Sequence, residues 1–285
     1  MQSSNTSMHG KTCMITGATA GIGEVTAQAL AQMGANVILV GRSQQKCIDT
    51  VSRIKENTGN SSVEYLLADL SSQAQIRTLA EEYQNQHYRL DVLVNNAGGA
   101  FVFRQESVDG IEMTFALNHL NYFLLTNLLL DTIKASSPAR IVNVSSNSHY
   151  GASINFADLE GKRKYWWNTA YGQSKLANVL FTYELARRLE GSSVTANVLH
   201  PGFVATDIGR NNGLLVHLLL WIAHRKALTP QEGARTTITL ASSPEVSEDT
   251  GKYFVKGKQV ESDPASYDLE TARRLWEVSA EMVGI

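Results

Sequence analysis

Two residues with the chemistry of a proton-transfer site, Tyr171 and Lys175, stand four positions apart in the run TAYGQSKLANVLFTYELARRL. Apolar residues recur along this run at helical spacing, so we predict a helix over residues 171–189. Positions i and i+4 share one face of a helix, which places the phenol beside the ammonium. A neighbouring cation favours the phenolate, so Lys175 is expected to lower the pKa of Tyr171 from its ordinary value of about 10. A phenol tuned in this way can act as a general acid or base.

The alternative is a tyrosine that packs in a core beside a solvated lysine. A lone Tyr-x-x-x-Lys pattern favours that alternative. Proton transfer at Tyr171 therefore needs support from the elements that would surround it.

Composition excludes several classes of protein. The chain of 285 residues is long enough to bury a substantial core. Its net charge of −2 argues against a nucleic-acid partner, and its two cysteines, Cys13 and Cys47, indicate neither a disulfide framework nor a metal site, as expected in a reducing compartment. The first residues, MQSSNTSMHGK, are polar, so we expect no signal peptide or membrane anchor and a flexible stretch over residues 1–9. The apolar run at 214–223, LLVHLLLWIA, is too short to span a bilayer, which favours a cytoplasmic protein or one that contacts the membrane peripherally through this run.

Short apolar runs alternate with amphipathic helical runs through most of the chain. The apolar runs are nearly continuous, as strands covered on both faces require. No linker rich in Pro, Gly or Ser interrupts them, so we predict one domain over residues 1–285, an α/β Rossmann-type doubly wound parallel sheet of about seven strands with helices on both faces. Ligands of such sheets bind outside the carboxyl ends of the strands. The predicted strands are 12–16, 36–40, 63–67, 91–95, 139–145 and 193–199, and the predicted helices are 24–33, 44–56, 73–86, 111–134 and 171–189.

A glycine-rich turn, TGATAGIG, follows the first predicted strand and precedes a helix. Gly17, Gly21 and Gly23 would allow a tight turn and a close approach of the backbone to a pyrophosphate at the helix N-terminus. A glycine turn alone is as often structural, but a strand before it and a helix after it favour dinucleotide binding.

The end of the second predicted strand decides between the two nicotinamide dinucleotides. An acidic residue there would bind the ribose 2′-hydroxyl of NAD, whereas this chain has Arg42 followed by Ser43. A guanidinium suits a 2′-phosphate, and the serine hydroxyl adds a donor, so NADP(H) is favoured over NAD(H). A solvated arginine at a helix start is the alternative.

The glycine spacing, T-G-x-x-x-G-x-G, resembles that of the short-chain dehydrogenase/reductase family, and further motifs follow in the family's order over almost the whole chain. Asp69 and Leu70 resemble the family's adenine contact, although Asp69 could instead cap a helix. The string Asn95-Asn96-Ala97-Gly98 resembles the element that lines the cofactor and steadies the sheet. Together the resemblance implies cofactor contacts at Gly17, Thr19, Gly21, Ile22, Gly23, Arg42, Ser43, Asp69, Leu70, Asn96, Ala97, Gly98, Tyr171, Lys175, Pro201, Gly202, Val204 and Thr206, the last two at the nicotinamide carboxamide.

The resemblance also implies a catalytic set. Ser146, which closes the fifth predicted strand, corresponds to the family's catalytic serine, and Asn118 matches the asparagine that bends a helix and anchors a proton-relay water. With Tyr171 and Lys175 they complete the set, so the resemblance favours proton transfer over packing. The filled set argues against a catalytically silent NADP(H)-sensing protein, which is the alternative from another class.

Two stretches resemble the retinol dehydrogenase-like branch of the family: NFADLEGKRKYWWNTAYGQSKLANVLF, and the C-terminal GKYFVKGK with ARRLWEVSAEMVGI. The branch implies interconversion of a retinal-like or other bulky lipophilic aldehyde or ketone with its alcohol, and a steroid or secondary-alcohol dehydrogenase is the alternative. In this family the segment after the sixth strand closes over the substrate. Residues 207–230, with several leucines and Trp221, are therefore expected to form a lid that lines an apolar pocket, rests in a membrane interface or packs on the protein. Trp166 and Trp167 flank the same pocket or pack at the surface, and pairing of two copies through the helices that carry the asparagine and the tyrosine is left open.

Overall fold

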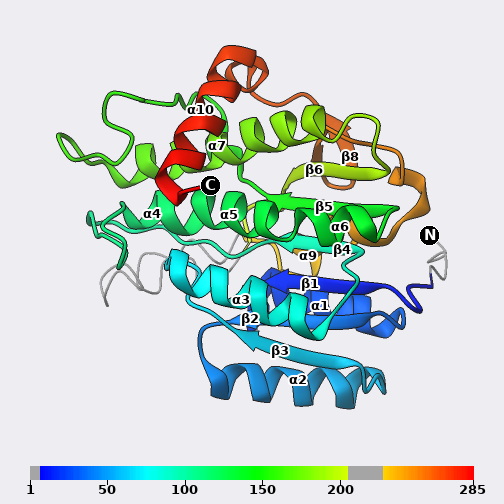
Figure 1. Ribbon diagram of the computed structural model, residues 1–285. Coiled ribbons are helices and arrows are strands. Elements are labelled where there is room, and N and C mark those ends of the chain that lie inside the picture. The colour runs from blue at the N-terminus through cyan, green and yellow to red at the C-terminus, as the bar shows by residue number, and fades with distance from the viewer. Residues whose placement is uncertain (1–6, 205–226) are drawn as a thin grey trace.

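One sheet organises the chain. The computed structural model describes residues 7–204 and 227–285, and within them eight strands form a single sheet in the order β3-β2-β1-β4-β5-β6-β7-β8 (Figure 1). Neighbouring strands are parallel except for β8, which pairs antiparallel with β7 at one edge. The strands are β1 (Thr12–Thr16), β2 (Asn36–Gly41), β3 (Val63–Leu67), β4 (Val92–Asn95), β5 (Ala139–Val144), β6 (Val194–His200), β7 (Tyr253–Val255) and β8 (Lys258–Val260).

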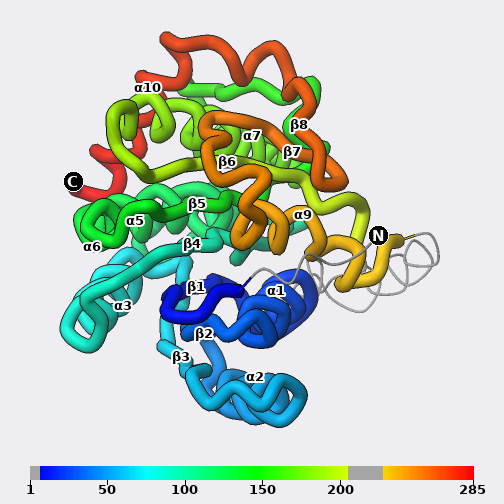
Figure 2. The backbone as a smooth tube through the Cα atoms, turned by 90° about the vertical axis from the view of Figure 1, so that its right-hand side faces the viewer, coloured from blue at the N-terminus to red at the C-terminus, as the bar shows by residue number. Residues whose placement is uncertain are grey.

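Two apolar cores lie on the two faces of this sheet. Figure 2 shows the helices that lie on either side of the sheet. Strand β1 is buried along its whole length, and its side chains alternate between the cores: Met14 faces one, while Cys13 and Ile15 face the other. Burial on both faces explains why the strands read as continuous apolar runs. The core of Met14 is closed mainly by α3 (Gln73–Gln86), α5 (Asn121–Leu128), α7 (Trp167–Arg188) and α10 (Leu269–Val283), and the core of Ile15 by α1 (Gly21–Gln32), α2 (Gln44–Thr58) and α9 (Pro230–Ser242).

The order of the strands reverses between β1 and β4. From β1 the chain builds outward to β2 and β3, and it then returns to β4 and continues to the other edge (Figure 1). This doubly wound arrangement and the six predicted strands are confirmed. The β7–β8 hairpin brings the sheet to eight strands, where about seven were expected. Sheets of this type bind ligands at the reversal, outside the carboxyl ends of β1 and β4.

The helix predicted over residues 111–134 is wrong as a continuous element. The structure divides it into α4 (Met113–Phe115), a π-helical segment (Ala116–Leu120), α5 and α6 (Leu130–Ala135). Side-chain amides compete for carbonyls of the helical ladder here: Asn121 Nδ2 donates to Leu117 O at 2.6 Å, and Asn127 Nδ2 donates to Phe123 O at 2.7 Å. π-Helical turns inside helices are rare, and those that occur are often found at functional sites. This one contains Asn118.

Two segments predicted from the sequence lie partly or wholly outside the described residues. Residues 1–6 and 205–226 are not described, so the run at 214–223, Thr206 and most of the predicted lid at 207–230 fall outside the described ranges. Met8 is buried and its amide donates to Met33 O at 2.8 Å, so packing begins within the stretch 1–9 that was predicted to be flexible. None of the helices formed by the described residues has the length and apolar character that a bilayer crossing needs.

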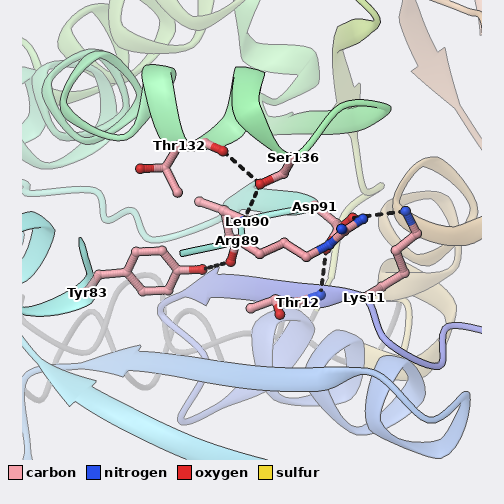
Figure 3. Close-up of polar contacts among 8 residues, drawn as sticks. All are labelled: Lys11, Thr12, Tyr83, Arg89, Leu90, Asp91, Thr132 and Ser136. Atoms are coloured by element: carbon pink, nitrogen blue, oxygen red, sulfur yellow. Dashed lines mark hydrogen bonds and ion pairs between the residues drawn. The ribbon is translucent and has the colours of Figure 1, made fainter. Parts of the chain in front are cut away.

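A buried carboxylate ties β1 to β4 at the amino ends of these strands (Figure 3). Asp91 is 2% exposed and accepts hydrogen bonds from the Thr12 amide at 2.9 Å, from Lys11 Nζ at 2.9 Å and from Arg89 Nε and Nη2 at 2.7 and 2.6 Å. Burial raises the pKa of Asp91, but the hydrogen bonds from Arg89, Thr12 and Lys11 outweigh burial and leave it below its ordinary value. The carboxylate is therefore charged and fully partnered at neutral pH.

Neutralising this carboxylate is expected to weaken the fold. Asp91→Asn keeps the shape of the side chain but removes the charge that faces Lys11 and Arg89, so we expect the free energy of unfolding to fall by about 2 kcal/mol. Urea unfolding followed by circular dichroism measures this loss. Glu106→Gln, which breaks an exposed ion pair with Arg104 at 2.8 Å, is the matched control and should change stability by less than about 1 kcal/mol. Equal effects of the two substitutions would contradict the role given to Asp91.

Candidate active site

The glycine turn leads from β1 into α1 as predicted. Gly17 and Gly21 adopt positive φ angles of 64° and 57°, which favour glycine. A Cβ on Gly23 would overlap the carbonyl oxygen of Gly17, so only glycine lets the turn fold back onto the start of the helix. Ile22, between them, is buried. The turn presents backbone N–H groups at a helix N-terminus, which is an arrangement that binds phosphate groups.

Side-chain hydrogen bonds fasten this turn to the end of β4. Asn96 Nδ2 donates to the carbonyl of Thr16 at 2.8 Å. In return, Thr16 Oγ1 accepts from the amides of Asn96 and Ala97 at 2.9 and 3.0 Å. Gly98 continues the segment, and a Cβ there would lie only 3.0 Å from Asn118 Oδ1. The Asn-Asn-Ala-Gly string therefore joins the glycine turn to a predicted catalytic residue.

Arg42 follows the carboxyl end of β2 beside the glycine turn. The methyl group of Thr19 packs so closely on Gly41 that a Cβ there would lie 2.9 Å from it, which places Arg42 and Ser43 next to the turn in space. The Arg42 side chain is exposed and forms no hydrogen bond or ion pair with another described residue. Its guanidinium is thus available to an anionic ligand.

Asp69 lies beyond β3, and the alternative that it caps a helix is wrong. Its Oδ1 accepts from the amide and hydroxyl of Ser71 at 3.0 and 2.7 Å, which is a local turn. The cap of α3 is Ser72, whose hydroxyl accepts from the Gln75 amide at 3.4 Å. Leu70, next to Asp69, is buried.

The segment after β6 returns to the start of α1. Gly202, which follows Pro201, has a positive φ of 93°. Val204 forms an isolated bridge with Leu228, and a Cβ on Gly233 would contact Val204 and Ile22 at 2.5 and 3.3 Å. Val204 and Ile22, two predicted cofactor contacts from distant parts of the sequence, are therefore close in space.

Helix α7 carries Tyr171 against the turn that follows β5. The Ser146 hydroxyl lies near enough to the Tyr171 phenol to lower its pKa, and it accepts from the Ser148 amide at 3.2 Å. Gly172 is buried where the helix meets this turn, and a Cβ there would lie 2.8 Å from the Ser148 carbonyl oxygen. Glycine at position 172 therefore permits the contact between tyrosine and serine. The sequence contains this signal, but sequence reasoning did not use it.

Lys175 is almost completely buried below the tyrosine. Its Nζ donates to the Val144 carbonyl at 3.2 Å and lies 5.6 Å from the centre of the Tyr171 ring. Burial lowers the pKa of Lys175 to about 7. Burial also raises the pKa of Tyr171 to about 12, against the opposing effect of the Ser146 hydrogen bond. The prediction that Lys175 lowers the pKa of Tyr171 is therefore wrong for this arrangement, because loss of solvent dominates for both groups.

Asn118 is held by both ends of its side chain. Oδ1 accepts from the Gly99 amide at 2.7 Å, and Nδ2 donates to the Gly99 carbonyl at 2.9 Å and to Ser174 Oγ at 3.0 Å. Ser174 precedes Lys175, so the amide connects the π-helical segment with α7 and with the segment after β4. Asn118, Ser146, Tyr171 and Lys175 are thus assembled at one site.

Sequence reasoning missed a buried polar chain behind this site. Asn178 Nδ2 donates to the Asn118 carbonyl at 2.9 Å, and its Oδ1 lies 3.3 Å from His119 Nδ1. His119 Nε2 is 2.9 Å from Ser279 Oγ on α10. A local signal existed for Asn178, which lies three residues after Lys175 on the same helix face. No local signal could place Ser279, because it is distant in the sequence.

The comparisons with known proteins agree with this geometry. The family model described as short chain dehydrogenase matches residues 11–214. The chain belongs to this family of oxidoreductases. Human retinol dehydrogenase 14 is 43% identical over 297 residues, covering 98% of this chain and 88% of the relative. Human polyprenol dehydrogenase is 44% identical over 285 residues, covering 96% of this chain and 86% of the relative. The chain is therefore related to the retinol dehydrogenases, as the sequence motifs indicated.

Solved structures extend the likeness to the fold. An uncharacterized protein from Mycobacterium paratuberculosis has a TM-score of 0.79 at 32% identity, covering 98% of this chain and 95% of that chain. An active-site complex of Pseudomonas aeruginosa RhlG with NADP has a TM-score of 0.71 at 29% identity, covering 89% of this chain and 97% of that chain. Both likenesses cover most of this chain.

The buried histidine of the polar chain gives a prediction for stability. Burial lowers the pKa of His119 to about 4, whereas an unfolded chain binds a proton at about 6.5. The unfolded state therefore binds more protons between these values, and stability present above pH 6.5 is lost as the pH falls towards 4, by up to about 3 kcal/mol. Unfolding by urea at pH 7, 6, 5 and 4.5 should show a steeper loss for the wild type than for His119→Gln. Parallel curves would contradict the prediction.

Proposed function

We propose that this chain is an NADP(H)-dependent oxidoreductase that interconverts a lipophilic aldehyde or ketone and its alcohol. The observation that carries the proposal is the placement of Ser146 next to Tyr171, with the buried Lys175 below the tyrosine ring. The pair lies on the carboxyl side of β5, and Asn118 joins it to the segment that holds the glycine turn. A general acid and a hydrogen-bond donor are thus arranged beside a dinucleotide-binding turn.

The residues present fit a bound nicotinamide dinucleotide. Gly17 and Gly23 leave room for close approach of a pyrophosphate, and the exposed Arg42 guanidinium suits a 2′-phosphate. When bound, the nicotinamide supplies or accepts the hydride. Likeness to RhlG in complex with NADP supports the same choice of cofactor.

The side chains of the site have distinct tasks in carbonyl reduction. Ser146 donates a hydrogen bond to the carbonyl oxygen, where negative charge develops in the transition state. Tyr171 gives its phenolic proton to that oxygen. The raised pKa of Tyr171 keeps the phenol protonated at neutral pH, which is the form that reduction requires. Lys175 would hold the nicotinamide ribose, and because burial lowers its pKa to about 7 it can bind or release a proton near neutral pH.

A lipophilic substrate is supported by the relatives and by the surface near the site. The names of two relatives specify retinol and polyprenol, which are both apolar alcohols. Trp166, at the start of α7, is 60% exposed, and Phe203, just beyond β6, is 57% exposed. Exposed aromatic side chains on the elements that lead into the site favour an apolar ligand. The proposal also includes a single domain over residues 1–285, in which residues 207–230 form a lid over the substrate. Pairing of two copies of the chain is a further part of it.

Removing the phenolic hydroxyl tests the reaction. Tyr171→Phe is expected to reduce turnover at least a thousandfold, on the order of what loss of an essential proton donor costs, while the Kd for NADPH changes less than about threefold. Loss of nicotinamide absorbance measures turnover with a panel of retinal-like aldehydes, lipid aldehydes and steroid ketones. Tyr88→Phe, at a tyrosine that is 92% exposed, is the control. Activity that survives in Tyr171→Phe sinks the assignment, and NADPH binding by a wild type that turns over no substrate would indicate a sensor.

Cofactor choice has a separate test. Arg42→Ala is expected to raise the Kd for NADPH by about tenfold to a hundredfold, with little change for NADH, because only NADPH carries the 2′-phosphate. Fluorescence titration with each nucleotide measures both constants. Lys55→Ala removes the same charge from the exposed far end of α2 and should leave both constants unchanged. Equal weakening of NADH and NADPH by Arg42→Ala would refute a contact with the 2′-phosphate.

A further inference from the structure

A second buried histidine lies directly beside the site and has no task in the mechanism above. His149 is the last residue of the short turn Asn147–His149, which Ser146 caps. Its ring is completely buried, with the rings of Tyr150 and Tyr253 centred 4.1 and 4.8 Å away. Burial of a titratable ring so close to the serine calls for a physical role.

The two ring nitrogens of His149 have fixed and different partners. Nδ1 lies 2.7 Å from the carbonyl oxygen of Ser146, and Nε2 accepts from the Asp263 amide at 3.1 Å. A backbone amide can only donate, so Nε2 carries no proton. A carbonyl oxygen can only accept, so Nδ1 carries the proton. The contacts therefore define one neutral tautomer.

The other end of this connection is itself firmly held. Asp263 Oδ2 accepts from the Gly151 amide at 2.7 Å, and its Oδ1 accepts from the Ala265 amide at 2.8 Å. The Tyr150 hydroxyl donates to the Glu261 carbonyl at 2.8 Å. The segment that follows β8 is thus hydrogen-bonded to three consecutive residues, His149, Tyr150 and Gly151. Of these three, only the His149 side chain also contacts the backbone of Ser146.

We propose that His149 is a positioning residue for Ser146. Its Nδ1–H holds the Ser146 carbonyl and so fixes the backbone that carries the serine hydroxyl beside the Tyr171 phenol. The proposal rests on the proposed function, because it gives His149 a role through the oxyanion donor. The Nε2 contact with Asp263 orients the ring for this task.

Substitutions that separate the two nitrogens test the proposal. His149→Asn keeps a donor at the place of Nδ1, whereas His149→Gln keeps a polar group near Nε2 only, and His149→Phe keeps neither. We expect kcat for an accepted carbonyl to fall about tenfold to a hundredfold in the Gln and Phe variants, with KM and the Kd for NADPH within about threefold of the wild type. The Asn variant should retain most of kcat. His9→Asn, at an exposed histidine that precedes β1, is the matched histidine control.

A double-mutant cycle distinguishes positioning of the serine from a general loss of structure. If His149 acts through Ser146, His149→Phe should cause little further loss of kcat in a Ser146→Ala background. Additive losses, or equal kcat in the Asn and Phe variants, would overturn the proposal.

A readout without turnover separates this proposal from the proposed function. Nitrogen-15 NMR of the histidine ring at pH 7 should show a protonated Nδ1 and a bare Nε2 for His149, identified by the signals lost in His149→Phe. A wild type that reduces no carbonyl would refute the function while this spectrum still tests the hydrogen bonds. The opposite tautomer or an imidazolium ion would refute the positioning role.

Discussion

The proposed catalytic arrangement depends on how closely α7 approaches the turn after β5. Gly172 is the point of contact, because any side chain there would collide with the Ser148 carbonyl. The approach is secured from the sheet side by Ser145, whose hydroxyl donates to the Lys175 carbonyl at 2.8 Å. With the helix at this distance, Tyr171 meets Ser146 and the Lys175 side chain ends at the Val144 carbonyl. A helix displaced outward by the width of one methyl group would separate the donor from the acid.

Buried polar side chains link the position of α7 to the strands β4 and β5 of the sheet. Asn95 Nδ2 on β4 donates to Asn143 Oδ1 on β5 at 2.8 Å, and Asn143 Nδ2 donates to Thr182 Oγ1 on α7 at 2.9 Å. Buried amides without partners are costly, so α7 can only settle where these bonds form. The polar ladder therefore specifies the position of the helix, while the apolar core supplies most of the stability.

Local patterns in the sequence were sufficient for the sheet, and the family resemblance supplied the residues that are proposed to react. Continuous apolar runs revealed the strands because each strand is covered on both faces, and the glycines marked a turn that no other residue could form. The family resemblance implied a bend in the helix at Asn118, but apolar spacing could not show that the bend is a π-helical turn, because side-chain amides compete for the carbonyls there. The pKa of Tyr171 also escaped, since i+4 spacing specifies a neighbour but not the loss of solvent around both groups. Contacts such as His149 with Asp263 depend on chain segments far apart in the sequence, which no local pattern encodes.

The ion-pair cluster around Asp91 has a consequence for how this protein can change over evolutionary time. The cluster lies at the amino ends of β1 and β4, whereas the loops that would choose the cofactor and substrate lie at the carboxyl ends. Substitutions that alter ligand preference therefore leave these buried charges and their partners intact. A scaffold built in this way can acquire new specificities without first acquiring extra stability, because the groups that tolerate variation are not the groups that hold the strands together.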